Sequence, residues 1–117
     1  MADALDALTK KIVNKCKRYG VDNIEFTDYA KQKMDFRNVE ADEIVRLLTS
    51  GKGAFYAEKQ EVPFQGDIEV RYKVVYRVSS RYSMIVVVSF YNKVLKVINV
   101  IKTSKGAERL WRKEVLE

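Results

Sequence analysis

Three cationic side chains, Arg71, Lys73 and Arg77, recur at spacings of two and four residues in the middle of the chain. In a β-strand, successive side chains point to opposite faces, so residues two and four apart share a face. The three charges therefore form a row about 20 Å long at ~3.4 Å per residue, and such a row can follow a phosphate backbone. The alternative is that this side of the strand simply faces water, which also favours Lys and Arg.

A second candidate phosphate site is the segment Lys102-Thr103-Ser104-Lys105-Gly106. We expect it to end a strand and open a helix, where backbone N–H groups, hydroxyls and ammonium groups can together hold a phosphate. A simple helix cap by Thr103 or Ser104 is the alternative. The segment is not a Walker loop, because the preceding glycines are absent.

Tyrosine is plentiful, with seven residues. Tyr72 and Tyr76 alternate with the cationic row on the opposite face of the strand, and we expect them in the core. Tyr82 and Tyr91 lie near predicted strand ends, where an aromatic ring can stack on an unpaired base.

The chain contains no histidine and a single cysteine, Cys16. This composition excludes Ser-His and Cys-His nucleophilic pairs and histidine general bases. It also argues against a zinc site, and we predict no metal and no cofactor. Cys16 falls on the apolar stripe of the first predicted helix, where we expect a buried, unreactive thiol. Any catalysis would use Lys, Arg, Tyr or carboxylate side chains.

Apolar spacing predicts the elements that must position these residues. Helices are expected over 3–19, 28–36 (capped by Thr27), 40–49 and 105–116. A short extended piece is expected over 23–26, and strands over 54–61, 69–78, 84–91 and 94–102, with a loop through Pro63 and Gly66. Helices followed by a strand meander predict an α+β fold, with helices packed on one face of a three- to four-stranded antiparallel sheet.

Size and composition favour one domain over residues 1–117 with one core, since the chain is 47% hydrophobic and 32% charged. The formal net charge is +6, and residues 81–117 hold eight Lys and Arg against three Glu. Such a basic end attracts polyanions, of which nucleic acid is the commonest in the cytoplasm; a surface charged for solubility is the alternative. We expect no membrane span and no secretory signal, and hence a cytoplasmic protein.

The segment from Phe26 to Val45 resembles the pattern F-T-x-H-A-x-x-R-M-x-x-R-x-I-x-x-x-x-V. That pattern opens an uncharacterised domain family related to the RelE/ParE and BrnT toxins. Segments 71–76, 84–88 and 97–104 resemble the family's strands in the same order, so the resemblance covers residues 23–105. Tyr29 stands where the family has histidine and Lys33 where it has arginine, which leaves Arg37 as the matching cation. Residues 1–20 lie outside the resemblance, as a packing addition, a dimer contact or an antitoxin-like cover.

The resemblance implies a RelE-like fold and a protein directed at RNA or the ribosome, with an antitoxin protein as a further partner. RelE-like proteins cleave messenger RNA without metal, using Lys, Arg and Tyr on the concave face of the sheet. We predict Arg71 and Arg77 of the cationic row, with Lys102 of the second phosphate site, as catalytic residues of a metal-independent endoribonuclease. Nucleic-acid contacts are expected from Arg37, Lys73, Tyr91, Lys105 and Tyr29. The alternatives are a non-catalytic nucleic-acid- or protein-binding module of the same fold, and a homodimer of unknown role.

Overall fold

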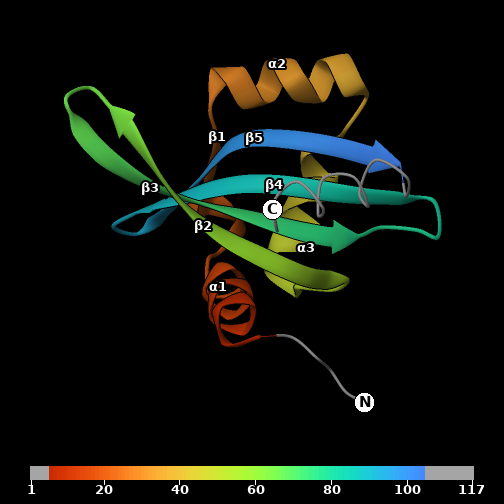
Figure 1. Ribbon diagram of the computed structural model, residues 1–117. Helices are drawn as coiled ribbons and strands as arrows, with labels where there is room; N and C mark the ends of the chain where they lie inside the picture. The colour runs from red at the N-terminus through yellow and green to blue at the C-terminus, as the bar shows by residue number, and fades with distance from the viewer. Residues whose placement is uncertain (1–5, 105–117) are drawn as a thin grey trace.

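Within residues 6–104, the part of the chain that the computed structural model describes, the protein has three α-helices and five β-strands (Figure 1). In chain order the elements are α1 (Ala7–Lys17), a short 3-10 helix (Val21–Asn23), β1 (Ile24–Phe26), α2 (Asp28–Arg37), α3 (Ala41–Ser50), β2 (Ala54–Phe64), β3 (Asp67–Arg77), β4 (Tyr82–Tyr91) and β5 (Val94–Ser104). Helices precede a meander of strands, so the predicted α+β class is confirmed. The helix predicted over 105–116 lies outside the described residues. None of the described helices is long and apolar enough to cross a membrane.

The strands form one mixed sheet in the order β1-β5-β4-β3-β2. Neighbours from β2 to β5 run antiparallel, but β1 lies parallel to β5, with Ile24 opposite Leu95 and Phe26 opposite Val97. The predicted sheet of three or four antiparallel strands is therefore corrected to five strands of mixed direction. The short segment 23–26 pairs with a strand at the far end of the meander, and no local pattern reveals such a pairing.

Local signals set the ends of α2 and α3. The hydroxyl of Thr27 accepts a hydrogen bond from the Ala30 N–H at 3.0 Å, as expected for the cap of α2. The two helices end at Asn38 and Gly51, whose φ values of 56° and 70° lie in the left-handed region. A Cβ on Gly51 would lie 2.9 Å from the Val13 side chain, so glycine also lets α3 end against α1.

The three described helices pack on one face of the sheet and share a single core. The core residues of the helices are Ile12, Val13, Cys16, Ala30, Met34, Ile44 and Leu48. Those of the facing strands are Val74, Tyr76, Met84, Val86, Val88, Leu95, Val97 and Val100. Cys16 is buried, as predicted, and burial raises the pKa of its thiol to about 12.

The side chains of β3 alternate between the two faces of the sheet, as its period-2 pattern predicted. Val74 and Tyr76 enter the core, whereas the cationic row lies on the opposite face. That opposite face is apolar at its centre, where Val75 and Ile85 are 0% and 2% exposed. The cations of β3 therefore flank a buried apolar patch and do not form one continuous charged surface.

Side chains of two helices donate to or accept from backbone groups at the two edges of the sheet. Beside β2, the buried hydroxyl of Thr9 in α1 accepts a hydrogen bond from the Ala57 N–H at 3.0 Å. Along β5, beyond its pairing with β1, Arg37 Nη1 of α2 donates to the Val100 carbonyl at 2.8 Å. Unpaired edge groups invite another strand to add to a sheet, and each of these bonds satisfies one such group.

The loop predicted through Pro63 and Gly66 is shorter than expected. β2 continues through Pro63 to Phe64, and Gln65 and Gly66 form the turn, with φ values of 52° and 81°. Proline has no N–H to donate, which an edge strand tolerates on its unpaired side.

Candidate functional site

The hairpin of β2 and β3 diverges from the rest of the sheet, because β4 runs on to Tyr91 but pairs with β3 only from Tyr72 to Arg77. We call this extension, residues 60–71, the β2–β3 arm. It twists across the sheet and away from α1 (Figure 1).

A cavity of about 680 Å³ lies between the β2–β3 arm, the sheet face opposite the core and the start of α2. Small-ligand sites commonly enclose ~300–1,000 Å³. We call this cavity the sheet hollow. Its charged and aromatic lining consists of Glu69, three cations and three rings: Arg71, Lys73, Lys96, Tyr29, Phe64 and Tyr91.

A β-bulge shapes the floor of the sheet hollow. The pairing of β4 with β5 shifts register between Val87 and Val88, which leaves Ile98 as an extra residue. Ile98 and its neighbour Asn99 both line the hollow as a result. The side-chain oxygen of Asn99 accepts a hydrogen bond from the Val100 N–H at 2.8 Å, so its amide N–H groups remain as donors.

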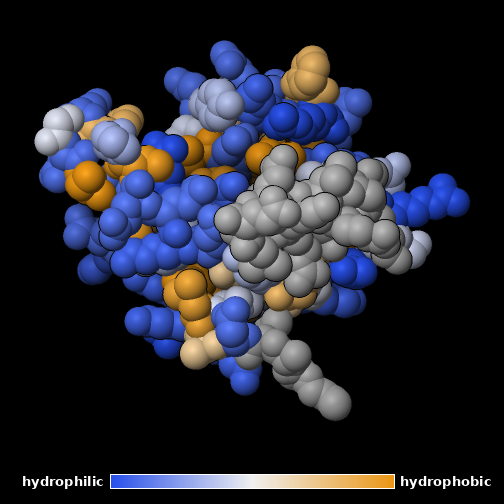
Figure 2. Space-filling model, in the orientation of Figure 1, coloured by the Kyte–Doolittle hydropathy of each residue, from blue (hydrophilic) through white to orange (hydrophobic). Residues whose placement is uncertain are grey.

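Three aromatic rings surround the sheet hollow and are accessible. Tyr29 of α2, Phe64 of β2 and Tyr91 of β4 are 51%, 46% and 40% exposed. Figure 2 shows hydrophobic residues gathered on and beside the β2–β3 arm, with hydrophilic residues around them. Accessible rings beside cations are the combination on which nucleic-acid bases stack.

A hydrogen-bonded network joins the polar residues of one wall. Glu69 accepts from Arg71 Nε at 2.6 Å through one carboxylate oxygen and from the Tyr91 hydroxyl through the other. On the other side of the network, Lys96 Nζ lies 4.8 Å from the centre of the Tyr91 ring. Glu69 thereby fixes the positions of both Arg71 and Tyr91, and Lys96 lies against the same ring.

The network shifts the pKa values of two of its members in opposite directions. Burial tends to raise the pKa of Glu69, but hydrogen bonds from Tyr91 and Arg71, with the charges of Arg71 and Lys96, hold it below the ordinary value of 4.5. The hydrogen bond to Glu69, followed by burial and the Glu69 charge, raises the pKa of Tyr91. Glu69 is therefore a carboxylate and Tyr91 a neutral phenol at neutral pH, and neither is poised to accept a proton.

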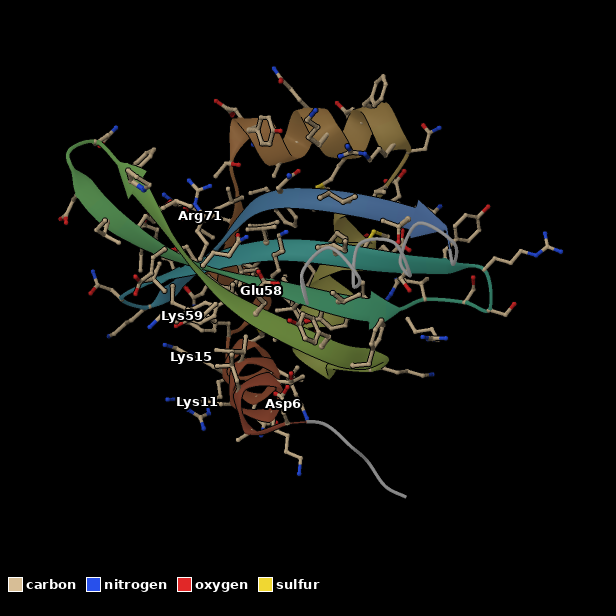
Figure 3. All side chains as sticks on the ribbon, viewed as in Figure 1. Asp6, Lys11, Lys15, Glu58, Lys59 and Arg71 are labelled. Atoms are coloured by element: carbon tan, nitrogen blue, oxygen red, sulfur yellow. The ribbon has the colours of Figure 1, made fainter. Side chains whose placement is uncertain are left out.

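Four of the residues predicted from the sequence lie together in the sheet hollow. They are Tyr29, Arg71, Lys73 and Tyr91, and they come from α2, β3 and β4. Figure 3 shows Arg71 projecting from β3 on the side of the molecule where α2 lies.

Arg77, Lys102 and Arg37 do not join this group. Arg77 lies about 20 Å along β3 from Arg71, with its guanidinium 5.0 Å from the centre of the Phe55 ring. Lys102 pairs with Met84 and so lies on the core-facing side of the sheet, over the Tyr82 ring.

Arg37 also lies apart from the sheet hollow. Arg37 donates to the backbone of β5, as described above, and Lys105 is outside the described residues. The three residues predicted as catalytic, Arg71, Arg77 and Lys102, are thus not brought together.

Sequence reasoning assigned no role to Glu69, Lys96 or Asn99, three polar residues of the hollow. Lys96 carried a usable signal, because it stands between two core residues of a predicted strand and so must face the opposite side. Glu69 stands two residues before Arg71 on the same face, which is also readable from alternation. Asn99 carried no such signal, since the bulge that exposes it breaks the period of two.

No group of three or more Cys, Asp or Glu side chains gathers as a metal site within residues 6–104. Comparison of the chain with protein-family models, with curated proteins and with solved structures finds no match.

Proposed function

We propose that the protein binds single-stranded RNA in the sheet hollow and does not cleave it. The observation that carries the proposal is the convergence of Arg71, Lys73 and Lys96 with three accessible aromatic rings on one cavity. Cations attract the phosphates and rings stack on unpaired bases, and this pairing of contacts is typical of single-strand binding. The resemblance to RelE-like proteins points to the same class of ligand.

Binding without cleavage is favoured over the endoribonuclease for two reasons. Arg71, Arg77 and Lys102 are too dispersed to stabilise one transition state. The carboxylate that lines the hollow, Glu69, is also a poor proton acceptor for a 2′-hydroxyl, because Arg71 and Tyr91 both donate to it and hold its pKa below the ordinary value.

The test is the salt dependence of affinity for a fluorescein-labelled oligouridylate. If all three cations contact phosphates, log K should fall with log salt at a slope of about −2, since each contact to a single strand contributes ~0.7. The triple variant Arg71→Gln, Lys73→Gln and Lys96→Gln should bind about 100-fold more weakly at low salt, at ~1 kcal/mol per lost contact.

The matched control removes three exposed lysines away from the hollow, Lys10, Lys11 and Lys52; Figure 3 shows Lys11 on α1, far from Arg71. Thermal unfolding checks that both triple variants are folded. If both triple variants lost RNA affinity equally, binding would reflect non-specific charge attraction, and the proposal would be refuted. If the RNA were shortened during incubation with the pure protein, the endoribonuclease hypothesis would replace this proposal.

A further inference from the structure

The accessible cations of the sheet hollow cover a short distance. Arg71 and Lys73 are two residues apart, which spans about 7 Å along a strand. Further along β3, Val75 is completely buried, and Ile85 beside it on β4 is almost completely buried. On this face, the stretch between Lys73 and Arg77 therefore offers an RNA strand no accessible side chain from Val75 or Ile85.

Carboxylates border the hollow on two other sides. Glu58 of β2 lies directly opposite Lys73, and Glu25 of β1 lies directly opposite Lys96. Both alternate with core residues, so they share the sheet face of the hollow but lie outside its lining. These charges disfavour further phosphates beyond the hollow.

Two cations beside Tyr91 present unused hydrogen-bond donors. Arg71 contacts Glu69 only through Nε, and its two terminal nitrogens have no partner among residues 6–104. Lys96 Nζ has no carboxylate within ion-pair distance in the same part of the chain. A guanidinium edge and an ammonium group near one ring suit a phosphate with several free oxygens.

Cations predominate in the lining itself, where three of them stand against one carboxylate, while Glu58 and Glu25 border it from outside. A multiply charged anion therefore gains more from the lining than a singly charged one. A phosphomonoester carries about −1.5 to −2 at pH 7, whereas a phosphodiester inside a strand carries only a single charge.

We infer that the sheet hollow receives one nucleotide bearing a terminal phosphate, and not the interior of a strand. The phosphate lies between Arg71 and Lys96, and the base stacks on the accessible ring of Tyr29 or Phe64. The inference rests on the proposed function, because it states which part of an RNA the hollow binds.

The experiment measures the affinity of the full chain for oligouridylates that differ only at their ends. The probes are a linear 12-mer with a 5′-phosphate, one with a 3′-phosphate, one with two hydroxyl ends, and the same 12-mer closed into a circle. Uridine monophosphates and diuridylates with and without a terminal phosphate complete the set. A 12-mer with one phosphate end should bind about tenfold more tightly than the circle, and a phosphorylated diuridylate nearly as tightly as that 12-mer.

The variant Lys96→Gln should lose most of the tenfold preference for a phosphate end, and Lys11→Gln on α1 should keep it. If free uridine monophosphate competes as well as the phosphorylated 12-mer, the hollow recognises one phosphorylated nucleotide, as inferred, but the proposed RNA binding loses its support.

Other outcomes overturn the inference in distinguishable ways. If the circle binds as tightly as the phosphorylated linear 12-mer, the hollow does not select a terminal nucleotide, although RNA binding stands. An affinity that keeps rising with strand length would lead to the same conclusion. If neither RNA nor nucleotides bind at low salt, the inference and the proposed function both fail.

Discussion

At the scale of single residues, Glu69 organises the wall of the sheet hollow. Its carboxylate accepts from Arg71 and Tyr91, so one acidic side chain orients a cation and a ring that face the ligand space. A long arginine that is held in place loses less conformational entropy when it binds an anion. The acid in a basic hollow is therefore a positioning group, although it lowers the net charge.

Replacement of Glu69 by glutamine should remove a pH-dependent part of the stability. The folded-state pKa of Glu69 lies below the unfolded value of 4.5, so its contribution is fully present above that pH and is lost as the pH falls through the lower folded pKa. Glu69→Gln should lower the free energy of unfolding by about 1 kcal/mol at neutral pH. Urea titrations from about pH 7 to pH 3 should show wild type and variant converging towards the acid end.

The matched control is Glu61→Gln on the same arm. Glu61 makes an exposed pair with Lys59 at 3.7 Å, and such pairs contribute little. If the difference in unfolding free energy between Glu69→Gln and wild type stayed constant with pH, the claim that the fold stabilises the Glu69 carboxylate would be refuted.

At the scale of elements, α1 is joined to the sheet by a side-chain hydrogen bond as well as by apolar contact. The completely buried Thr9 hydroxyl takes the place of a neighbouring strand for the Ala57 N–H of β2. Of the three roles open for the first helix, this contact favours the packing addition.

The substitution Thr9→Val keeps the shape of the side chain but leaves the buried Ala57 N–H without an acceptor. It should cost about 1–3 kcal/mol of unfolding free energy in urea titrations, the usual penalty for an unsatisfied buried donor. Thr9→Ser retains the hydroxyl and should recover most of the hydrogen-bond loss. If serine is as destabilising as valine, the missing methyl and not the hydrogen bond is responsible.

At the scale of the whole molecule, one core joins α1 to every other described helix. Ile12, Val13 and Cys16 belong to the same buried cluster as Leu48 of α3 and Val86 of β4. Residues outside the family resemblance are therefore part of the folding unit.

The substitution Ile12→Ala should destabilise the entire domain by about 2–5 kcal/mol, because it leaves a cavity in the shared core. Calorimetry should show a single transition at lower temperature, whereas an independently folding α1 would leave the main transition unmoved. Lys11→Ala, exposed on the same helix, should change the stability by less than about 0.5 kcal/mol.

The sequence by itself determined the local features of this protein. Alternation in β3 assigned Val74 and Tyr76 to the core and Arg71 and Lys73 to the other face, and Thr27 marked the start of α2. These features depend on neighbours within a few residues, so a linear pattern contains them.

Only the tertiary structure decided which residues from distant parts of the chain lie together. It paired β1 with β5, and it turned the β2–β3 arm so that Arg71 lies in one hollow with Tyr29 and Lys96, while Arg77 and Lys102 stay outside it. Strand twist, a bulge and pairing between distant segments produced this arrangement. None of these three features follows a local period in the sequence. The sequence therefore predicted the cationic row as one site, whereas the fold separates Arg77 from Arg71 and Lys73.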